Sequence, residues 1–279
     1  MRRRQGLALV AVLWLGAALS IIVAGLLQSV RTEARLGAQL RGDAQAAAAA
    51  EAAMQLALQS LLAEARPLDR LIAGDFVWQD QPIAVQVMPL NGYIDLNAAP
   101  PELLAQMFQT AAGLPQDQAN TLAQALLRER TQPGASGAPP GFEAVEDLLR
   151  VPGIDYPLYA RVAPLLTADL MAGSGRVNPL AAPPAVLRVL TGGNDAAAAQ
   201  YTAARAAGDA AASAPAMNTA WLDAAAARVL ELQALVPLAD GARIRVVRRY
   251  ALAAQRLDGL PWRAFYARSF VDPAAAPAQ

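Results

Sequence analysis

The amino-acid sequence predicts an α+β fold, in which a long N-terminal helix packs on a small antiparallel sheet and a large all-α domain is inserted between strands of that sheet. Three observations carry this prediction. An apolar run at the N-terminus continues into an amphipathic segment. β-branched and aromatic residues gather near residues 76–87 and again after residue 242, and the stretch between them has helical periodicity.

The N-terminal run, residues 7–27, contains no charged residue and follows Arg2, Arg3 and Arg4. About 20 apolar residues in a helix cross a hydrocarbon core of about 30 Å, and arginines on one flank hold that flank in the cytoplasm. We therefore expect one transmembrane helix with a cytoplasmic N-terminus, and the rest of the chain outside the inner membrane.

A glycine, Gly6, separates the arginines from the apolar run. Cleavage after Gly6 would leave a mature chain that begins at Leu7 and keeps the apolar helix. This short basic leader, residues 1–6, resembles the class III leader of type IV pilins and type II secretion pseudopilins, which a prepilin peptidase cleaves and N-methylates. An uncleaved anchor, or a conventional signal peptide cut between residues 17 and 20, is the alternative.

One position departs from the pilin pattern. Most pilins carry a glutamate at the fifth position after the cleaved glycine, where this sequence has Ala11. A carboxylate in lipid needs a positive partner, which the N-terminal amine of a neighbouring subunit supplies during assembly. A subunit at the tip of a filament has no neighbour above it, and among pseudopilins the K-type minor subunit typically lacks this glutamate. A membrane anchor without pilin ancestry would lack it too.

Composition excludes several chemistries. The chain has no cysteine, histidine or lysine, and it has 23 basic and 23 acidic residues. This excludes disulfides, cysteine nucleophiles, histidine bases and the usual zinc ligands. The balanced charge also gives no excess of basic residues for binding nucleic acid. Glu143, Glu146 and Asp147 gather at a helix start, where acidic residues complement the helix dipole. Since no phosphate loop or nucleophile elbow appears either, we expect a protein that is not an enzyme and requires no cofactor.

We expect the N-terminal helix to continue outside the membrane over residues 28–66. Its apolar residues recur at three- and four-residue steps or their multiples: Leu36, Leu40, Met54, Leu58, Leu61 and Leu62. Pro67 then ends the helix. An anchor followed by an independent surface helix is the alternative.

The small β domain is expected in two parts, residues 67–91 and residues 239–271, with a disordered tail at residues 272–279. The β-rich segments are residues 76–78, 83–87, 243–247, 250–254 and 262–271. The region between these parts, residues 92–238, is expected to be the inserted α-helical domain. Its helical patterns are residues 103–110, 116–130, 144–150, 157–166, 196–211 and 219–235, with loops at 131–141 and 213–218.

The inserted region contains an internal repeat. The segment GYIDLNAAPPELL (residues 92–104) is echoed by GRVNPLAAPPAVL (residues 175–187). Both copies are expected to be a short extended segment that leads into a helix, because proline suits the first helical turn and Asp or Asn side chains bond nearby backbone donors. The residues that mark the two helix starts are Gly92, Asn97 and Pro100 in the first copy and Gly175, Asn178 and Pro183 in the second.

These motifs resemble the general secretion pathway protein K family, the minor pseudopilins of type II secretion. Its inserted α-domain typically has G-I-N-L-N-T-A-P, a helix, a V-P-G-I turn and a second helix. This sequence matches at Gly92, Ile94, Leu96, Asn97, Ala99 and Pro100, at residues 145–154 (VEDLLRVPGI) and again at residues 175–183. Asp95 and Ala98 replace the usual asparagine and threonine. With the leader, the resemblance covers nearly the whole chain and implies a pilin-type fold with two helix-hairpin-helix or SAM-like subdomains.

The resemblance also implies a function. The protein would cap the tip of the type II secretion pseudopilus in a Gram-negative inner membrane and start its assembly for export across the outer membrane. Partners would be the I- and J-type minor pseudopilins, the major pseudopilin, the prepilin peptidase and the inner-membrane platform. The assembly helix would pack through Leu13, Trp14, Gly16, Ala17, Ala18 and Gly25. Some relatives bind calcium, but no ligand positions can be matched to this sequence.

A membrane-anchored helix-hairpin-helix protein that binds DNA, as in competence, is the rival interpretation. In such modules hairpin glycines approach a phosphate with help from nearby Lys or Arg. Here Asp155 follows the Pro152-Gly153-Ile154 turn and places a carboxylate where a phosphate would come. The sequence therefore disfavours DNA binding.

Overall fold

The computed structural model describes residues 4–64, 67–79, 81–132, 141–169, 174–208, 217–238, 241–257 and 259–272. The predicted loops at 131–141 and 213–218 and the predicted tail at 272–279 lie largely outside these residues.

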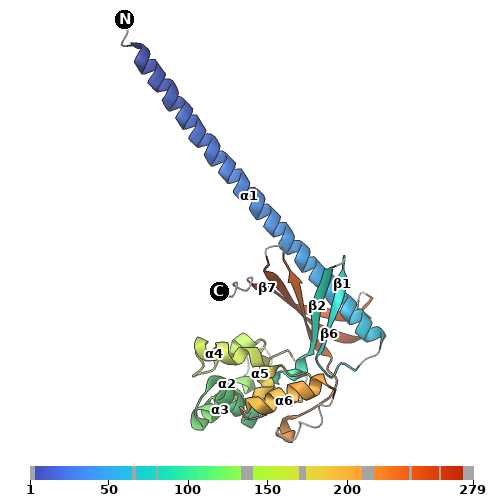
Figure 1. The fold of residues 1–279 in the computed structure, drawn as a ribbon. Helices are drawn as coiled ribbons and strands as arrows, with labels where there is room; N and C mark the ends of the chain where they lie inside the picture. The colour runs from blue at the N-terminus through green and yellow to red at the C-terminus, as the bar shows by residue number, and fades with distance from the viewer. Residues whose placement is uncertain are drawn as a thin grey trace.

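A single helix, α1 (Arg4–Ala63), forms the N-terminal 60 residues that the structure describes. At 1.5 Å per residue it is about 90 Å long. Its first half projects away from the rest of the molecule, while the second half lies against the sheet (Figure 1). The predicted continuation of the apolar helix beyond residue 27 is confirmed.

The sheet has five antiparallel strands in the order β1-β2-β5-β6-β7. These strands are β1 (Ile72–Trp78), β2 (Gln81–Pro89), β5 (Val229–Pro237), β6 (Arg243–Leu257) and β7 (Leu260–Asp272). The predicted antiparallel pair near residues 76–87 and the predicted C-terminal strands are confirmed. The inserted domain leaves the sheet after β2 and returns at β5, so the strands that flank it are neighbours in the sheet.

The predicted helix at residues 219–235 is wrong. Only a short 3-10 helix, η5 (Thr219–Trp221), forms there, and Val229–Pro237 is the central strand β5. One face of β5 is fully buried through Leu230, Leu232, Ala234 and Val236, and on the other face Gln233 and Leu235 are only half-buried. Its Leu, Glu, Gln and Ala residues favour a helix locally, and tertiary packing overrides that preference. The sheet therefore resumes at Val229, earlier than the predicted boundary at residue 239.

The second half of α1 packs on the sheet through small residues. Ala50, Ala53 and Ala57 are fully buried with Met54 and Leu58 against apolar residues of β2, β5 and β6. Leu36 and Leu40, which the periodicity also assigned to the packed face, are exposed by 56% and 60%. They lie beyond the end of the sheet, so the helix packs on it only from about Ala46 onward.

The inserted domain has its own hydrophobic core. Its elements are η1 (Leu90–Gly92), β3 (Ile94–Asp95), α2 (Pro101–Ala112), α3 (Gln116–Thr131), η2 (Val145–Arg150), α4 (Tyr156–Val162), η3 (Ala163–Leu165), β4 (Leu166–Thr167), α5 (Pro184–Leu190) and α6 (Asp195–Ala206). The predicted helices near 103–110, 116–130, 157–166 and 196–211 are confirmed with shifted ends, and the segment at 144–150 is a 3-10 helix. The domain lies at the end of the sheet remote from the N-terminus (Figure 1).

Candidate functional site

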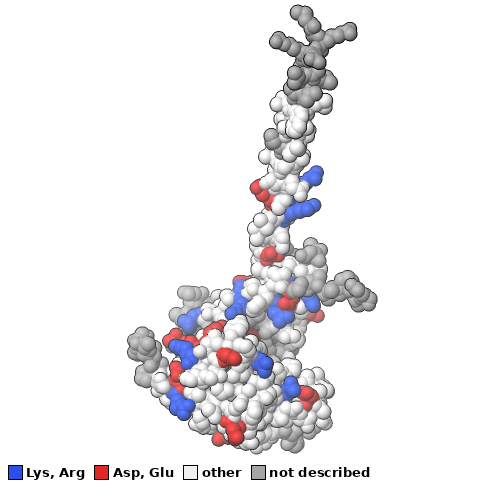
Figure 2. Space-filling view, turned by 90° about the vertical axis from the view of Figure 1, so that its left-hand side faces the viewer, with Lys and Arg blue, Asp and Glu red and all other residues white. Residues whose placement is uncertain are grey.

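The N-terminal half of α1 offers an apolar surface that the chain itself does not cover. Among the described residues, this helix alone is long and apolar enough to cross a membrane. Its most apolar 18-residue window has a mean hydropathy of 1.9, and none of that window is buried. Figure 2 shows the described part of this half without acidic or basic side chains until the charged residues near its middle.

The predicted packing residues lie on this open half. The side chains of Leu13 and Trp14 are 67% and 73% exposed. A Cβ placed on Gly16 or Gly25 would meet no atom within 4 Å, so both glycines leave room for a second helix. Ala17 and Ala18 are exposed as well. Gly6, Leu7 and Ala11 lie near the start of α1, while Met1–Arg3 are outside the described residues.

The first copy of the repeat forms a tight turn before α2. The Asp95 carboxylate accepts a hydrogen bond from the backbone N–H of Asn97 (2.9 Å), and the carbonyl of Asp95 accepts from the N–H of Ala99 (2.8 Å). The Asn97 amide bonds both backbone groups of Phe142, at 2.9 and 2.7 Å. Pro100 then takes the N-cap position. The expected extended segment, turn and helix start are confirmed.

The second copy repeats this geometry before α5. The side chain of Asn178 accepts a hydrogen bond from the N–H of Leu180 (3.0 Å), and its carbonyl accepts from the N–H of Ala182 (3.0 Å). Pro183 takes the N-cap position, as Pro100 does in the first copy. The Asn178 amide also donates to the carbonyl of Asp69, which lies just before β1. This copy is therefore bonded directly to the sheet domain.

The two copies interlock through their glycines. A Cβ on Gly92 would lie 2.6 Å from the carbonyl of Ala181, in the second copy. A Cβ on Gly175 would lie 2.1 Å from the carbonyl oxygen of Ala98, in the first copy, and Gly175 also has a positive φ of 71°. Each glycine therefore allows one copy to lie against the Ala-Ala backbone of the other. The structure brings the six predicted motif residues to one place, where two helical subdomains meet. The first subdomain contains α2, α3 and α4, and the second contains α5 and α6.

Each turn is also held by an arginine from a later helix. In the first subdomain Arg130 of α3 donates to the carbonyls of Ala99 (3.0 Å) and Leu96 (3.5 Å). In the second subdomain Arg205 of α6 donates to three carbonyls at 2.8–3.2 Å, those of Pro179, Leu180 and Ala182. Burial lowers the pKa of both guanidinium groups. No local pattern in the sequence marks these arginines, because each bonds backbone groups more than twenty residues away.

Asp95 is a buried carboxylate that is only half satisfied. Its residue is 2% exposed, and its second oxygen has no hydrogen-bond partner among the described residues. Burial raises the pKa of Asp95 to about 6, against the opposing effects of the Asn97 N–H and the Arg130 charge, while the charge of Asp169 adds to the rise. The equivalent residue of the second copy is the neutral Asn178.

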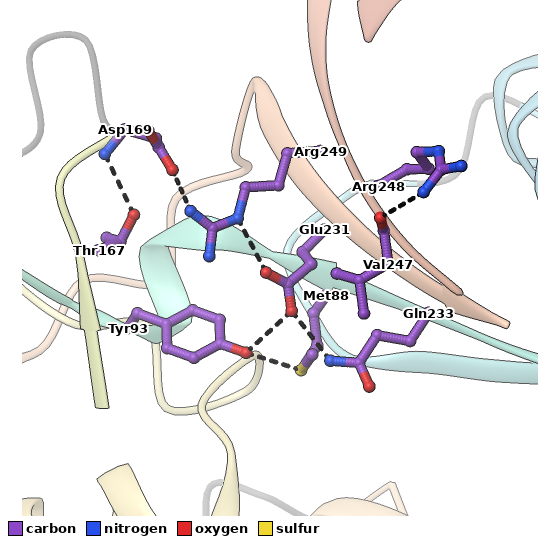
Figure 3. Close-up of polar contacts among 9 residues, drawn as sticks. All are labelled: Met88, Tyr93, Thr167, Asp169, Glu231, Gln233, Val247, Arg248 and Arg249. Atoms are coloured by element: carbon purple, nitrogen blue, oxygen red, sulfur yellow. Dashed lines mark hydrogen bonds and ion pairs between the residues drawn. The ribbon is translucent and has the colours of Figure 1, made fainter. Parts of the chain in front are cut away.

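A partly buried ionic cluster joins the first subdomain to the sheet (Figure 3). Arg249 of β6 donates to Glu231 of β5 (2.9 Å) and to Asp169, which follows β4 of the inserted domain. The hydroxyl of Tyr93 donates to Glu231 (3.3 Å), and the Arg249 guanidinium lies over the ring of Tyr266, 4.6 Å from its centroid. We call Asp169, Glu231, Arg249 and Tyr93 the junction cluster.

The charges of the junction cluster depend on one another. Burial alone lowers the pKa of Arg249, but the adjacent Glu231 and Asp169 reverse this effect, so the net pKa is raised and the guanidinium stays charged. Burial and the charge of Glu231 raise the pKa of the Tyr93 phenol, which stays neutral and donates. A cleft of about 500 Å³ opens beside the cluster, between the sheet and the inserted domain.

No sequence motif marks the junction cluster, because its members come from four separate segments of the chain. Glu231 also fell within the stretch predicted as a helix. No group of three or more acidic side chains suited to a metal ion occurs among the described residues. The expectation of possible calcium binding therefore still has no assigned ligand.

Comparisons with known proteins concern the fold. No protein-family model and no curated protein sequence matches the chain. A chain in the crystal structure of the GspK-GspI-GspJ complex from the type 2 secretion system of enterotoxigenic Escherichia coli is similar, with a TM-score of 0.50 and 15% sequence identity. The match covers 86% of this chain and 99% of that chain. At this identity the likeness establishes a shared pseudopilin-like α+β fold.

Proposed function

We propose that this protein is a minor pseudopilin of a type II secretion system, which caps the tip of the pseudopilus and starts its assembly. The observation that carries the proposal is the division of α1. One half is apolar and uncovered, and the other half is the packed spine of a sheet domain. Such a helix can rest in a membrane and later exchange lipid for the helices of other subunits. The role is structural and needs no catalytic group.

Two features support a place at the tip. Ala11 stands where a filament subunit would carry the carboxylate that pairs with its neighbour's N-terminal amine. In addition, the inserted domain departs from adjacent strands at one end of the sheet and adds a second core there. We infer that a domain of this size fits above the filament rather than within its wall.

The proposed partners follow from a position at the tip of the pseudopilus. The I- and J-type minor pseudopilins would pack against α1, and the major pseudopilin would be added below by the inner-membrane platform. The N-terminus would face the cytoplasm, and the sheet and inserted domains would lie in the periplasm. The similar solved structure comes from an assembly of GspK with GspI and GspJ, which supports this choice of partners.

The test is the N-terminus of the mature chain in a host with the secretion system. Wild-type protein should begin at N-methylated Leu7 by intact mass, whereas Gly6→Val should keep residues 1–6 and abolish secretion. Gly37→Val, at a position with open space around the helix, should be processed normally. A wild-type N-terminus at Met1 or near Ser20, or normal secretion by the uncleaved variant, would overturn the proposal.

A second test addresses the tip. Ala11→Glu should allow the subunit to be incorporated along filaments, and the neutral Ala11→Gln should not. Immunogold labelling of filaments formed with excess major pseudopilin distinguishes label at one end from label along the length. Label along the length with the wild-type chain would contradict tip capping.

A further inference from the structure

A pocket of about 550 Å³ lies between two hairpins of the inserted domain, the turn between α2 and α3 and the loop before α4. We call it the hairpin pocket. The residues that matter here are Leu114, Asp117, Leu122, Asp155, Leu158 and Arg161. The lining includes no residue of α1 or of the five-stranded sheet, and none of the junction cluster.

The apolar part of the pocket is made by three leucines. Leu122 is buried, and Leu114 and Leu158 are half-buried. Gly153 has a φ of 92°, and a Cβ there would lie 2.9 Å from a methyl carbon of Leu122. The glycine therefore lets the loop before α4 lie directly on α3, which places these leucines around one space. An aliphatic side chain inserted there would contact leucine on several sides.

The polar part of the pocket has an excess of negative charge. Asp117 and Asp155 are both exposed. One oxygen of Asp155 accepts from the N–H of Leu158 (2.9 Å); its other oxygen and the Asp117 carboxylate have no partner among the described residues. The one cation, Arg161, donates to the carbonyl of Ala112 (3.2 Å). Two carboxylates thus face solvent beside an apolar space, and the guanidinium between the helices is already bonded.

A ligand backbone would also find donors here. α3 begins at Gln116, and its N-cap residue Pro115 provides no side-chain acceptor. The first amides of a helix lack partners within it, so those of α3 remain available for a carbonyl oxygen. An anionic ligand is disfavoured by Asp117 and Asp155, whereas a polypeptide supplies a neutral carbonyl, an aliphatic side chain and a cation together.

We propose that the hairpin pocket binds an extended segment of a partner protein in which a leucine-like side chain lies next to a lysine or arginine. The aliphatic side chain enters between Leu114, Leu122 and Leu158, and the cation faces Asp117 and Asp155. This inference goes beyond the proposed function and does not depend on it, because the pocket is formed within the inserted domain.

The test uses the full chain in detergent micelles with methyl-labelled leucine, observed by NMR. The probes are three capped tetrapeptides: Ala-Leu-Arg-Ala, Ala-Leu-Glu-Ala and Ala-Ser-Arg-Ala. The Leu-Arg peptide should shift the methyl signals of Leu122 and Leu158 with millimolar affinity, as a single anchor residue allows. Joint substitution Asp117→Asn and Asp155→Asn should weaken this binding about five-fold. The asparagine at 155 keeps the oxygen that accepts from Leu158.

A matched control is Asp195→Asn, which removes an exposed first-turn carboxylate from α6 outside the pocket and should leave binding unchanged. Equal shifts from all three peptides, or no shift at about 10 mM Leu-Arg peptide, would overturn the proposal. Stronger shifts from a short DNA duplex than from the peptide would overturn it in favour of the helix-hairpin-helix interpretation. None of these outcomes bears on processing at Gly6, so failure here leaves the pseudopilin proposal standing.

Discussion

The two copies of the internal repeat share one backbone design but are attached to the sheet domain by different chemistry. The second copy is joined by neutral hydrogen bonds: Asn178 donates to the carbonyl of Asp69, and Leu71 donates to the carbonyl of Leu180. The first copy lies beside the ionic junction cluster and carries the buried carboxylate of Asp95. The neutral attachment is insensitive to pH and salt, whereas the ionic one depends on every member remaining paired.

The largest effect is expected where the copies interlock. Gly175→Ala places a Cβ against the carbonyl oxygen of Ala98 at a positive φ, so the two subdomains must separate. We expect a loss of more than ~4 kcal/mol in the free energy of unfolding of the inserted domain. Hydrogen exchange of its peptides, measured on the full chain in detergent, reports this loss. Gly192→Ala, with the same backbone strain and open space, should cost only about 1 kcal/mol. Equal effects of the two substitutions would contradict the interlock.

The next effect tests the ionic attachment. Arg249→Met leaves the buried Glu231 and the half-buried Asp169 without a cation, and we expect a loss of about 3 kcal/mol, at the low end for a broken buried pair. Thermal unfolding of the full chain measures it. The matched control is Arg245→Met on the same strand, because its ion pair with Asp272 is largely exposed and worth under ~1 kcal/mol. A cost for Arg249→Met no larger than that of the control would show that the cluster does not hold the first subdomain.

The sequence predicted the local parts of this arrangement and not the distant ones. Pro100 and Pro183 mark helix starts, and Asp95 and Asn178 mark turns, because these preferences act over a few residues. The long helix followed from periodicity, and strands β1, β2, β6 and β7 followed from their β-branched and aromatic residues. Strand β5 was not recognised, since its Leu, Glu, Gln and Ala residues favour a helix locally and its neighbour β2 is remote in sequence.

The candidate site also has parts that the sequence predicts and parts that it does not. The uncovered half of α1 was predicted from an unbroken apolar run, and the six motif residues were found because they repeat. The junction cluster has no such signal, because it depends on charges from two strands and a loop, together with the Tyr93 hydroxyl, meeting in space. Nor did the sequence indicate that Gly175 lies on the backbone of Ala98.

A smaller effect compares the two arginines that hold the turns. Arg205→Met removes bonds to three carbonyls, and we expect it to cost about 2–3 kcal/mol. Arg130→Met removes one good bond and one long bond and should cost about half as much. Urea unfolding followed by hydrogen exchange can assign each loss to its own subdomain. A larger loss for Arg130→Met would show that its charge near Asp95 matters more than its hydrogen bonds.

The smallest effect removes the chemical difference between the copies. Asp95→Asn gives the first copy the neutral side chain that the second has, and its oxygen can still accept from the N–H of Asn97. The pKa of Asp95 is raised to about 6 in the folded chain. Between pH ~4 and ~6 the Asp95 carboxyl group is therefore protonated in the folded state and ionised in the unfolded state. Stability therefore falls as the pH rises through that window, by up to about 3 kcal/mol.

In the Asp95→Asn variant this fall should be absent, so wild type and variant should diverge as the pH rises from 4 to 7. The net gain at pH 7 should be only about 1 kcal/mol, because the new amide N–H groups lack acceptors and the attraction of Arg130 is lost. Urea unfolding at several pH values measures the difference, and Asp75→Asn, an exposed carboxylate on β1, is the control. The free energies of unfolding of wild type and of Asp95→Asn could instead change in parallel with pH. The folded chain would then stabilise the Asp95 carboxylate as well as water does, and the two copies would differ in composition but not in electrostatics.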